Sequence, residues 1–294
     1  MGNPRAFLNT PRKEAGYRPI NDRIHDFGEV EQTLNSNDRR TQASRCMDCG
    51  VPFCHWACPL GNKPPEWNDA IYKGDWKLAF EELTSTNDFP EFTGRVCPAL
   101  CEKACVLNLM EHEPTTIRED ECAIIERAFE EDYVQPNIPK RNGYTICIVG
   151  AGPAGLSAAT QLNQKGYKVT VIDARENAGG LLRFGIPNFK LNKIIIDRRL
   201  NLLKEEGIEF QFNTKLVDSP KKKTNGKSEI ATNIQQDNTL DKDKSVTIDE
   251  LSKKYNVVVV CTGTPTARDL KIPGRDLNGV YFALEMLSQQ NRIL

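Results

Sequence analysis

The sequence predicts an α+β chain in which a helical N-terminal domain is followed by an α/β domain. Two runs of cysteine in the first half are separated by stretches whose apolar residues recur at helical spacing. From residue 144 a β-branched strand, a glycine-rich turn, a helix and a second strand follow one another, as in a parallel α/β unit. Residues 134–142 are polar and contain two prolines, which is typical of a linker. We therefore place the domains at 1–140 and 141–294.

Composition narrows the class of protein and its compartment. The chain has 294 residues, a formal net charge of −1 and 39% hydrophobic residues, enough for two domains with cores of their own. The balanced charge gives no footprint for nucleic acid, and no apolar run approaches the ~20 residues that span a bilayer. Ten cysteines without a secretory segment indicate a reducing cytoplasm, where thiols bind metal rather than form disulfides.

Seven cysteines lie in two dense runs, the first of which ends in Cys-Pro: Cys46, Cys49, Cys54 and Cys58, then Cys97, Cys101 and Cys105. Buried thiolates repel one another unless a cation or cluster holds them. Disulfides suit small secreted domains, and structural zinc commonly uses two C-x2-C pairs, of which these runs contain one. The spacing x2, x4, x3 before Cys-Pro differs from a ferredoxin run in its middle gap, and iron–sulfur clusters fit best.

Short helices are expected around these cysteines. Residues 1–35 read as an extended arm, and Ser36 or Asn37 caps a helix that ends near Cys46. Helices are expected at 66–73, after two prolines, and at 76–84, where Asp75 is the cap. Four aromatic side chains are expected either to shield the clusters or to form the core: Phe53, Trp56, Trp67 and Trp76.

A carboxylate stands where an apolar residue is expected in the helix from 118 to 131. Its inward stripe includes Glu121, Ile124 and Ala128 at helical spacing. Two four-iron clusters need eight ligands and the runs supply seven, so Glu121 is a candidate eighth, with Cys122 as its rival. A solvated helix-end carboxylate is the third possibility, and spacing alone does not decide between them.

A dinucleotide-binding turn follows the linker. A strand at 144–149, in which Cys147 is expected to be core, leads into Gly150-Ala-Gly152-Pro-Ala-Gly155, then a helix and a strand at 168–172. The glycines permit a tight turn and close approach to a pyrophosphate, which the helix N-terminus attracts. Asp173 ends the second strand, where an acid accepts from a ribose hydroxyl.

Later segments favour FAD over NAD as the dinucleotide. A glycine-studded loop at 179–187 is followed by a helix at 191–206 and a strand at 208–212, and a buried strand at 257–260 returns to a small polar turn. Residues 218–246 interrupt this pattern as a polar, flexible surface insertion. The helix after it begins with a capping box at Thr247–Glu250.

These motifs together resemble a known family. The two cysteine runs, the G-A-G-P-A-G-L turn, "GGLLRFGIPNFKL", "CTGTPTARDLKIPGR", "EAGYRPINDRI" and "ASRCMDCGVPFC" are similar to the small (β) subunit of bacterial NADPH-dependent glutamate synthases. The similarity spans nearly the whole chain outside 218–246. The same electron-input module occurs in dihydropyrimidine dehydrogenase and in bifurcating ferredoxin:NADP transhydrogenases.

The resemblance implies ligand sets that the residues alone left open. One 4Fe-4S cluster would be held by Cys46, Cys49, Cys54 and Cys105. The other would be held by Cys58, Cys97 and Cys101 with Glu121, which stands where dehydrogenase relatives have a glutamine. The FAD contacts implied are Gly150, Gly152, Pro153, Ala154, Gly155, Asp173 (a glutamate is usual), Gly180, Leu181, Lys190, Thr262 and Gly263.

The resemblance also implies a role. In the family, a hydride passes from NADPH to FAD, and electrons then pass through the clusters to a large (α) subunit that forms glutamate from glutamine and 2-oxoglutarate. The chain stops where the family continues into an NADPH domain, so we expect an incomplete Rossmann-like FAD domain and no nicotinamide site. No acid–base or nucleophilic constellation is evident, and His55 is expected to lie beside the clusters or at the surface. The remaining alternative is a non-catalytic metal-binding interaction module.

Overall fold

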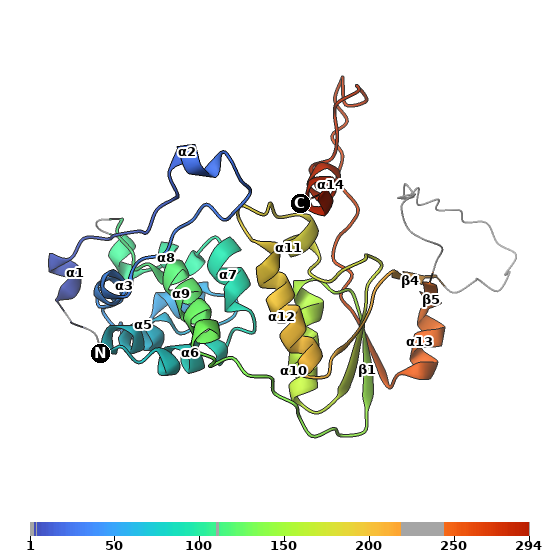
Figure 1. Cartoon of the computed structure of the whole chain (residues 1–294), viewed down its shortest axis with the longest axis horizontal. Coiled ribbons are helices and arrows are strands. Elements are labelled where there is room, and N and C mark those ends of the chain that lie inside the picture. The colour runs from blue at the N-terminus through green and yellow to red at the C-terminus, as the bar shows by residue number, and fades with distance from the viewer. Residues whose placement is uncertain (1–2, 4, 110–111, 219–243, 294) are drawn as a thin grey trace, which may run out of the picture. The chain divides into compact units, whose positions relative to one another are not determined.

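The computed structural model describes residues 3, 5–109, 112–218 and 244–293 (Figure 1). Their contacts divide the chain into two compact units. The first unit runs up to Gln135 and includes Ile186–Asp197; the second consists of Pro136–Gly185 and Arg198–Ile293. No helix among the described residues is long and apolar enough to cross a membrane.

The first unit is helical (Figure 1). Its elements are α1 (Ala6–Asn9), α2 (Ile20–Arg23), α3 (Ser36–Ala43), α4 (Phe53–Ala57), α5 (Pro64–Lys73), α6 (Trp76–Thr84), α7 (Pro90–Val96), α8 (Leu100–Lys103), the 3-10 turn η1 (Val106–Asn108) and α9 (Ile117–Glu130). The helix α12 (Lys193–Glu205) begins in this unit and ends in the second.

The longer helices form where capping and periodicity predicted them. The carboxylate of Asp75 accepts from the Leu78 amide at 3.0 Å and begins α6, and α5 starts on its two prolines. Apolar faces of α3, α5, α6 and α9 enclose one core, whose buried members are Ala43, Trp67, Ala70, Ile71, Trp76, Ala79, Leu83, Ile117 and Ile124.

Three expectations for this unit are wrong. The cap of α3 is Asn35, whose side chain accepts from the amides of Asn37 and Asp38, because the helix starts one residue earlier than expected. The N-terminal arm is not wholly extended, since it contains α1 and α2. Trp67 and Trp76 are core and Phe53 lines the pocket of the first four thiols, but Trp56 is 84% exposed, because α4 is a five-residue surface helix with no buried residue.

The second unit contains a parallel sheet with strand order β3-β2-β1-β6. Its elements are β1 (Thr145–Val149), α10 (Pro153–Gln164), β2 (Lys168–Ile172), α11 (Leu181–Phe184), β3 (Glu209–Gln211), α13 (Ile248–Lys254), β6 (Val257–Val260) and α14 (Ala283–Ile293). A separate parallel pair is formed by β4 (Thr214–Val217) and β5 (Lys244–Thr247). Figure 1 shows α10 and α13 on opposite sides of the sheet.

The register brings the carboxyl ends of the strands together at one edge. Val149 of β1 pairs with Ile172 of β2 on one side and with Val260 of β6 on the other. The expectation that β6 is buried is wrong: Val257 and Val260 are 50% and 56% exposed, because β6 is an outer strand of this sheet among the described residues.

The unit boundaries differ from those expected at residue 140. Residues 136–142 belong to the sheet unit, because the Arg141 guanidinium donates to Asn163 and to the Tyr167 carbonyl. Residues 186–197 belong to the helical unit, where Val30 donates its amide to the Phe189 carbonyl.

The insertion expected at 218–246 differs at its end. Residues 219–243 lie outside the described residues, and 244–246 are part of β5 rather than of an irregular loop. The capping box is confirmed: Thr247 and Glu250 exchange both of its bonds at the start of α13.

Candidate functional site

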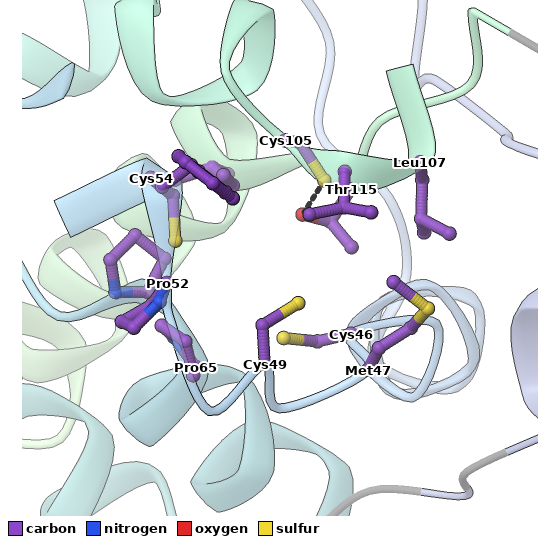
Figure 2. A pocket seen from close by; sticks show the side chains of 13 residues that line it. Cys46, Met47, Cys49, Pro52, Cys54, Pro65, Cys105, Leu107 and Thr115 are labelled. Atoms are coloured by element: carbon purple, nitrogen blue, oxygen red, sulfur yellow. Dashed lines mark hydrogen bonds between the residues drawn. The ribbon is translucent and has the colours of Figure 1, made fainter. Parts of the chain in front are cut away.

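Four thiols of the first unit face one pocket (Figure 2). Cys46 and Cys49 lie on the loop after α3, Cys54 is in α4, and Cys105 follows α8. Figure 2 shows the four sulfur atoms pointing toward a shared space. The structure therefore brings together the first ligand set that the resemblance implied.

The thiols of this pocket would be stabilised as thiolates by a bound cation or metal cluster. Burial raises the pKa of Cys46 and of Cys54 to about 12, with a further contribution from the neighbouring thiols. Without a cation these thiols stay protonated at neutral pH, whereas a cluster takes them as thiolates and supplies the opposite charge. No three Cys, His, Asp or Glu side chains among the described residues converge on a single metal ion. Four thiols spread around a pocket suit an iron–sulfur cluster.

A second set of donors gathers around Cys101 in α8. Burial raises the pKa of its thiol first, followed by nearby charges: Glu102, Glu121, Cys58 and Cys97. Cys58 and Cys97 cap the C-termini of α4 and α7, and Glu121 is in α9. The other three members of the second expected set, two thiols and one carboxylate, thus lie within electrostatic reach of Cys101.

Both cysteine runs turn at a residue in the left-handed conformation. Asp48, between Cys46 and Cys49, has φ 50°, and Ala99, between Cys97 and Cys101, has φ 54°. This conformation costs a residue with a Cβ roughly 1–2 kcal/mol. Such strain persists where the surrounding structure imposes it, and it gathers at functional sites.

Glu121 and Cys122, the two candidates for the eighth ligand, differ in their surroundings. Glu121 is 5% exposed, and burial raises its pKa to about 7 against the opposing hydrogen bonds from Thr93 and Asn87. The thiol of Cys122 has its pKa raised by burial to about 11, and its opposing charge is Arg95. A solvated Glu121, the third possibility, is excluded by its burial.

The two donor sets share one core. Cys54 of the first set and Cys101 of the second both pack against the cluster of Trp67, Ile71 and Leu83. Helices that fix one set therefore also fix the other.

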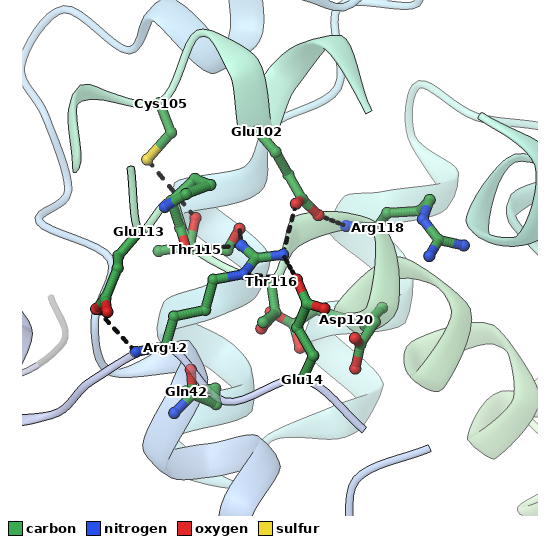
Figure 3. Close-up of polar contacts among 12 residues, drawn as sticks. Arg12, Glu14, Gln42, Glu102, Cys105, Glu113, Thr115, Thr116, Arg118 and Asp120 are labelled. Atoms are coloured by element: carbon green, nitrogen blue, oxygen red, sulfur yellow. Dashed lines mark hydrogen bonds and ion pairs between the residues drawn. The ribbon is translucent and has the colours of Figure 1, made fainter. Parts of the chain in front are cut away.

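The N-terminal arm is tied to the segment between the two sets (Figure 3). The Arg12 guanidinium donates to the carbonyls of Pro114 and Thr115 at 2.7 and 3.0 Å and pairs with Glu102 at 2.8 Å. The Thr115 hydroxyl in turn lies 3.9 Å from the Cys105 sulfur. The arm thus holds the chain that runs from Cys105 to α9.

The three glycines after β1 have the distinct roles that a dinucleotide turn requires. A Cβ on Gly150 would strike the Cys261 carbonyl, and one on Gly155 would strike the Gly150 carbonyl. Glycine at these two positions therefore allows neighbouring backbone segments to pack closely. A Cβ on Gly152 would meet nothing nearer than 3.9 Å, which leaves its backbone open to a ligand. No described side chain caps the N-terminus of α10, where Pro153 and Ala154 are exposed.

Most of the other expected dinucleotide residues surround this turn. Asp173 accepts from the Ala151 amide at 2.6 Å and keeps lone pairs for a ribose hydroxyl. Gly180 has φ 51° and lies against Gly152, with Leu181 following it. Thr262 and Gly263 follow Cys261, whose amide donates to the Val149 carbonyl at 2.7 Å. An extended dinucleotide along this edge fits the cradle.

Two expected residues have other partners. Lys190 belongs to the helical unit, where it pairs with Glu31, and its contact with FAD stays a prediction. His55 lies 3.3 Å from Glu66 and is partly exposed. Cys147 is fully buried in β1, as expected of a core residue.

Sequence reasoning missed the polar residues behind the donor sets. Asn87 and Thr93 bond Glu121, and Arg12 and Thr115 support Cys105. Their sequence signals are weak, because each lies far along the chain from the ligand side chain or backbone that it supports.

Two family models match the chain. Residues 23–133 match the family described as dihydropyrimidine dehydrogenase domain II, 4Fe-4S cluster, and residues 144–294 match pyridine nucleotide-disulphide oxidoreductase. The expected order, a helical iron–sulfur domain before an α/β oxidoreductase domain, is confirmed by these matches and by the elements observed.

The chain is also similar to named curated proteins. It is 43% identical over 295 residues to the glutamate synthase [NADPH] small chain of Mycobacterium tuberculosis, covering 100% of this chain and 55% of that one. It is 42% identical over 299 residues to the small chain of Bacillus subtilis, covering 98% and 55%. It is 41% identical over 293 residues to glutamate synthase [NADH] of Schizosaccharomyces pombe, covering 99% and 13%. The chain thus spans about half the length of the small chains it matches.

Proposed function

The chain belongs to the pyridine nucleotide-disulphide oxidoreductase family, and from this premise we propose that it is the electron-input part of an NADPH-dependent glutamate synthase small subunit. Its similarity to glutamate synthase small chains over nearly its whole length supports this assignment. Its partner is then a large (α) subunit, which converts L-glutamine and 2-oxoglutarate to two L-glutamate, and its compartment is the cytoplasm.

The observation that carries the proposal is the pair of four-donor sets on one core. Cys46, Cys49, Cys54 and Cys105 would hold one 4Fe-4S cluster. Cys58, Cys97, Cys101 and Glu121 would hold the other. Cys54 and Cys101 pack against the same buried core cluster, so one group of helices supports both sets.

The sheet unit would hold FAD. Gly150, Gly152 and Gly155 admit its pyrophosphate, Asp173 accepts from its ribose, and the 179–181 and 261–263 segments flank it. When bound, the flavin supplies exchange between two-electron nicotinamide chemistry and one-electron iron–sulfur chemistry. The residues of this chain place the groups, exclude water and set the charge around them; none of them needs to take a proton from a substrate.

Anaerobic purification tests the proposal directly. We expect about eight iron and eight sulfide per chain, as two cubanes require, and one FAD. Cys97→Ser and Glu121→Ala each should lower iron by about half, while Cys122→Ala, the matched control beside Glu121, should keep all of it. Zinc without sulfide would instead indicate the non-catalytic metal-binding module.

A second assignment is favoured by the match of residues 23–133, whose description names dihydropyrimidine dehydrogenase. On that alternative the same electron-input module serves a pyrimidine-reducing or transhydrogenase partner. Both assignments predict the same iron content, so mixing with the candidate partners separates them. Stable association with a glutamate synthase large subunit, and glutamine-dependent glutamate formation by that complex, supports the first; association only with a pyrimidine reductase contradicts it.

A further inference from the structure

The carboxylate of Glu121 is held from one side only. The Asn87 amide donates to Oε1 at 3.0 Å, and the Thr93 hydroxyl donates to the same oxygen. Both donors lie on the chain that leads into and through α7, whereas Glu121 is in α9. Oε1 therefore has two protein donors, and no hydrogen bond to a described residue is found at Oε2.

The second donor set lies within electrostatic reach of this carboxylate. Glu121 acts electrostatically on the thiol of Cys101, together with Cys58 and Cys97. A carboxylate with two donors on one oxygen has its other oxygen available for a metal. One ligating oxygen also completes a set of four with the three thiols.

The two donors are themselves fixed. The Asn87 carbonyl oxygen accepts from the Phe89 amide at 3.1 Å, and its amide also reaches the Thr93 hydroxyl at 2.9 Å. Asn87 is 2% exposed, so water does not compete for these bonds. The amide orientation is settled by the network, because only a carbonyl oxygen can accept from the Phe89 amide.

We propose that Asn87 and Thr93 are positioning residues that hold Oε1 of Glu121 and present Oε2 as the single carboxylate ligand to the cluster of Cys58, Cys97 and Cys101. The inference rests on the proposed function, in that it takes this set to hold a cluster. The donors draw negative charge from the ligand. Charge withdrawn from a ligand favours the reduced, more negative cluster, so the two hydrogen bonds raise its reduction potential.

Thr93→Val tests this role with little change in shape. It removes the hydroxyl that bonds Glu121 and keeps the β-branched volume in α7. Thr93→Ser restores the hydroxyl. Thr84→Val is the matched control, because it makes the same change in another helix of the same unit, where the Thr84 hydroxyl bonds the Phe80 carbonyl at 2.8 Å and no donor set.

The readout is a redox titration of the anaerobic protein followed by electron paramagnetic resonance, with iron counted and melting recorded for each variant. We expect Thr93→Val to lower the potential and change the signal of one cluster, while the other cluster is unchanged and serves as the internal reference. Thr93→Ser should return both features toward the original, and Thr84→Val should alter neither cluster. Loss of that one cluster in Thr93→Val, reversed in Thr93→Ser, would also support the proposal.

Other outcomes overturn it. Unchanged potentials and signals in Thr93→Val would show that the hydroxyl does not act on the ligand, and equal changes in both clusters would point to a general packing role. Two further measurements, on Glu121→Ala and on the unmutated protein, distinguish an error about Asn87 and Thr93 from an error about the presence of a cluster. If that variant keeps two unaltered clusters, Glu121 is not a ligand. If the unmutated protein contains no iron, the proposed function itself fails.

Discussion

At the scale of single residues, the glycine turn after β1 separates packing from binding. Gly155 lies so close to the Gly150 carbonyl that a Cβ would overlap its oxygen, and Ile148 of β1 would be in contact with the same Cβ. Gly152 has open space where a Cβ would point, with φ −79° and ψ −179°, which any residue adopts. The two glycines should therefore fail in different ways when a methyl group is added.

We expect Gly155→Ala to destabilise the sheet unit and Gly152→Ala to leave it folded but without flavin. The first forces α10 away from β1, and overpacking of this kind costs about 1–3 kcal/mol or more. The second places a methyl group where a pyrophosphate would approach the backbone. Thermal melting and FAD per chain measure the two effects, with iron content as a control that neither should change. Full flavin content in Gly152→Ala would place the dinucleotide elsewhere.

Single residues also show which parts of the candidate site could be predicted from the sequence and which could not. The inward position of Glu121 was predictable from the apolar stripe of its helix and is confirmed by its burial, whereas its choice over Cys122 as a ligand rests on the resemblance and stays a prediction. Asn87 and Thr93 were not predictable, since their hydrogen bonds depend on how α7 lies against α9, which no local pattern encodes. Lys190, which was expected at the flavin, pairs with Glu31 inside the helical unit, and its role toward the flavin stays a prediction.

At the scale of elements, capping and periodicity predicted helices well and burial of strands poorly. α6 has the bounds and the Asp75 cap that were expected. Four consecutive valines suggested a buried β6, yet this strand lies at the side of the sheet and is half exposed. A hydrophobic sequence indicates that a strand has apolar side chains to bury. It does not indicate which elements bury them, because those come from distant parts of the chain.

The contact between α7 and α9 gives a prediction at this scale. A Cβ on Gly94 of α7 would lie 2.8 Å from the backbone nitrogen and Cα of Cys122 in α9. We expect Gly94→Ala to push the two helices apart, destabilise the helical unit by about 1–3 kcal/mol and loosen the cluster for which Glu121 is the proposed ligand. Chemical unfolding and the rate of iron release measure these effects.

The control for this variant is another glycine of the same unit. Gly50 is not in a left-handed conformation, and a Cβ there would meet no atom within 4 Å. Gly50→Ala should leave stability and iron release near those of the original protein. If Gly94→Ala behaves in the same way, the close approach of α7 to α9 is not what fixes Glu121.

At the scale of the whole chain, the cysteine loops and the core helices are stabilised by different interactions. The cysteine loops carry only short elements: α4 has five residues, α8 has four and η1 has three. Helices this short are not stable by themselves in water. The core helices α5, α6 and α9, with 10, 9 and 14 residues, are held by buried apolar contacts instead.

Removing the clusters should therefore loosen the cysteine loops and spare the sheet. We expect hydrogen exchange to rise in residues 46–58 and 97–108 of iron-depleted protein. Thiols whose pKa is raised by burial become neutral there, and no cluster links them any longer. Residues 145–149 and 168–172 should stay protected, since β1 and β2 bond each other without any metal.

The flavin gives the reciprocal experiment. Loss of FAD, for which Gly152→Ala provides a folded chain, should raise exchange in residues 150–156 and 179–185 and leave the cysteine loops as they were. Mass spectrometry of peptides from the iron-depleted, flavin-free and complete proteins compares the three states in one assay. If depletion of iron exposes β1 and β2 as much as the cysteine loops, the two units do not fold independently, and the domain division proposed from the sequence fails with them.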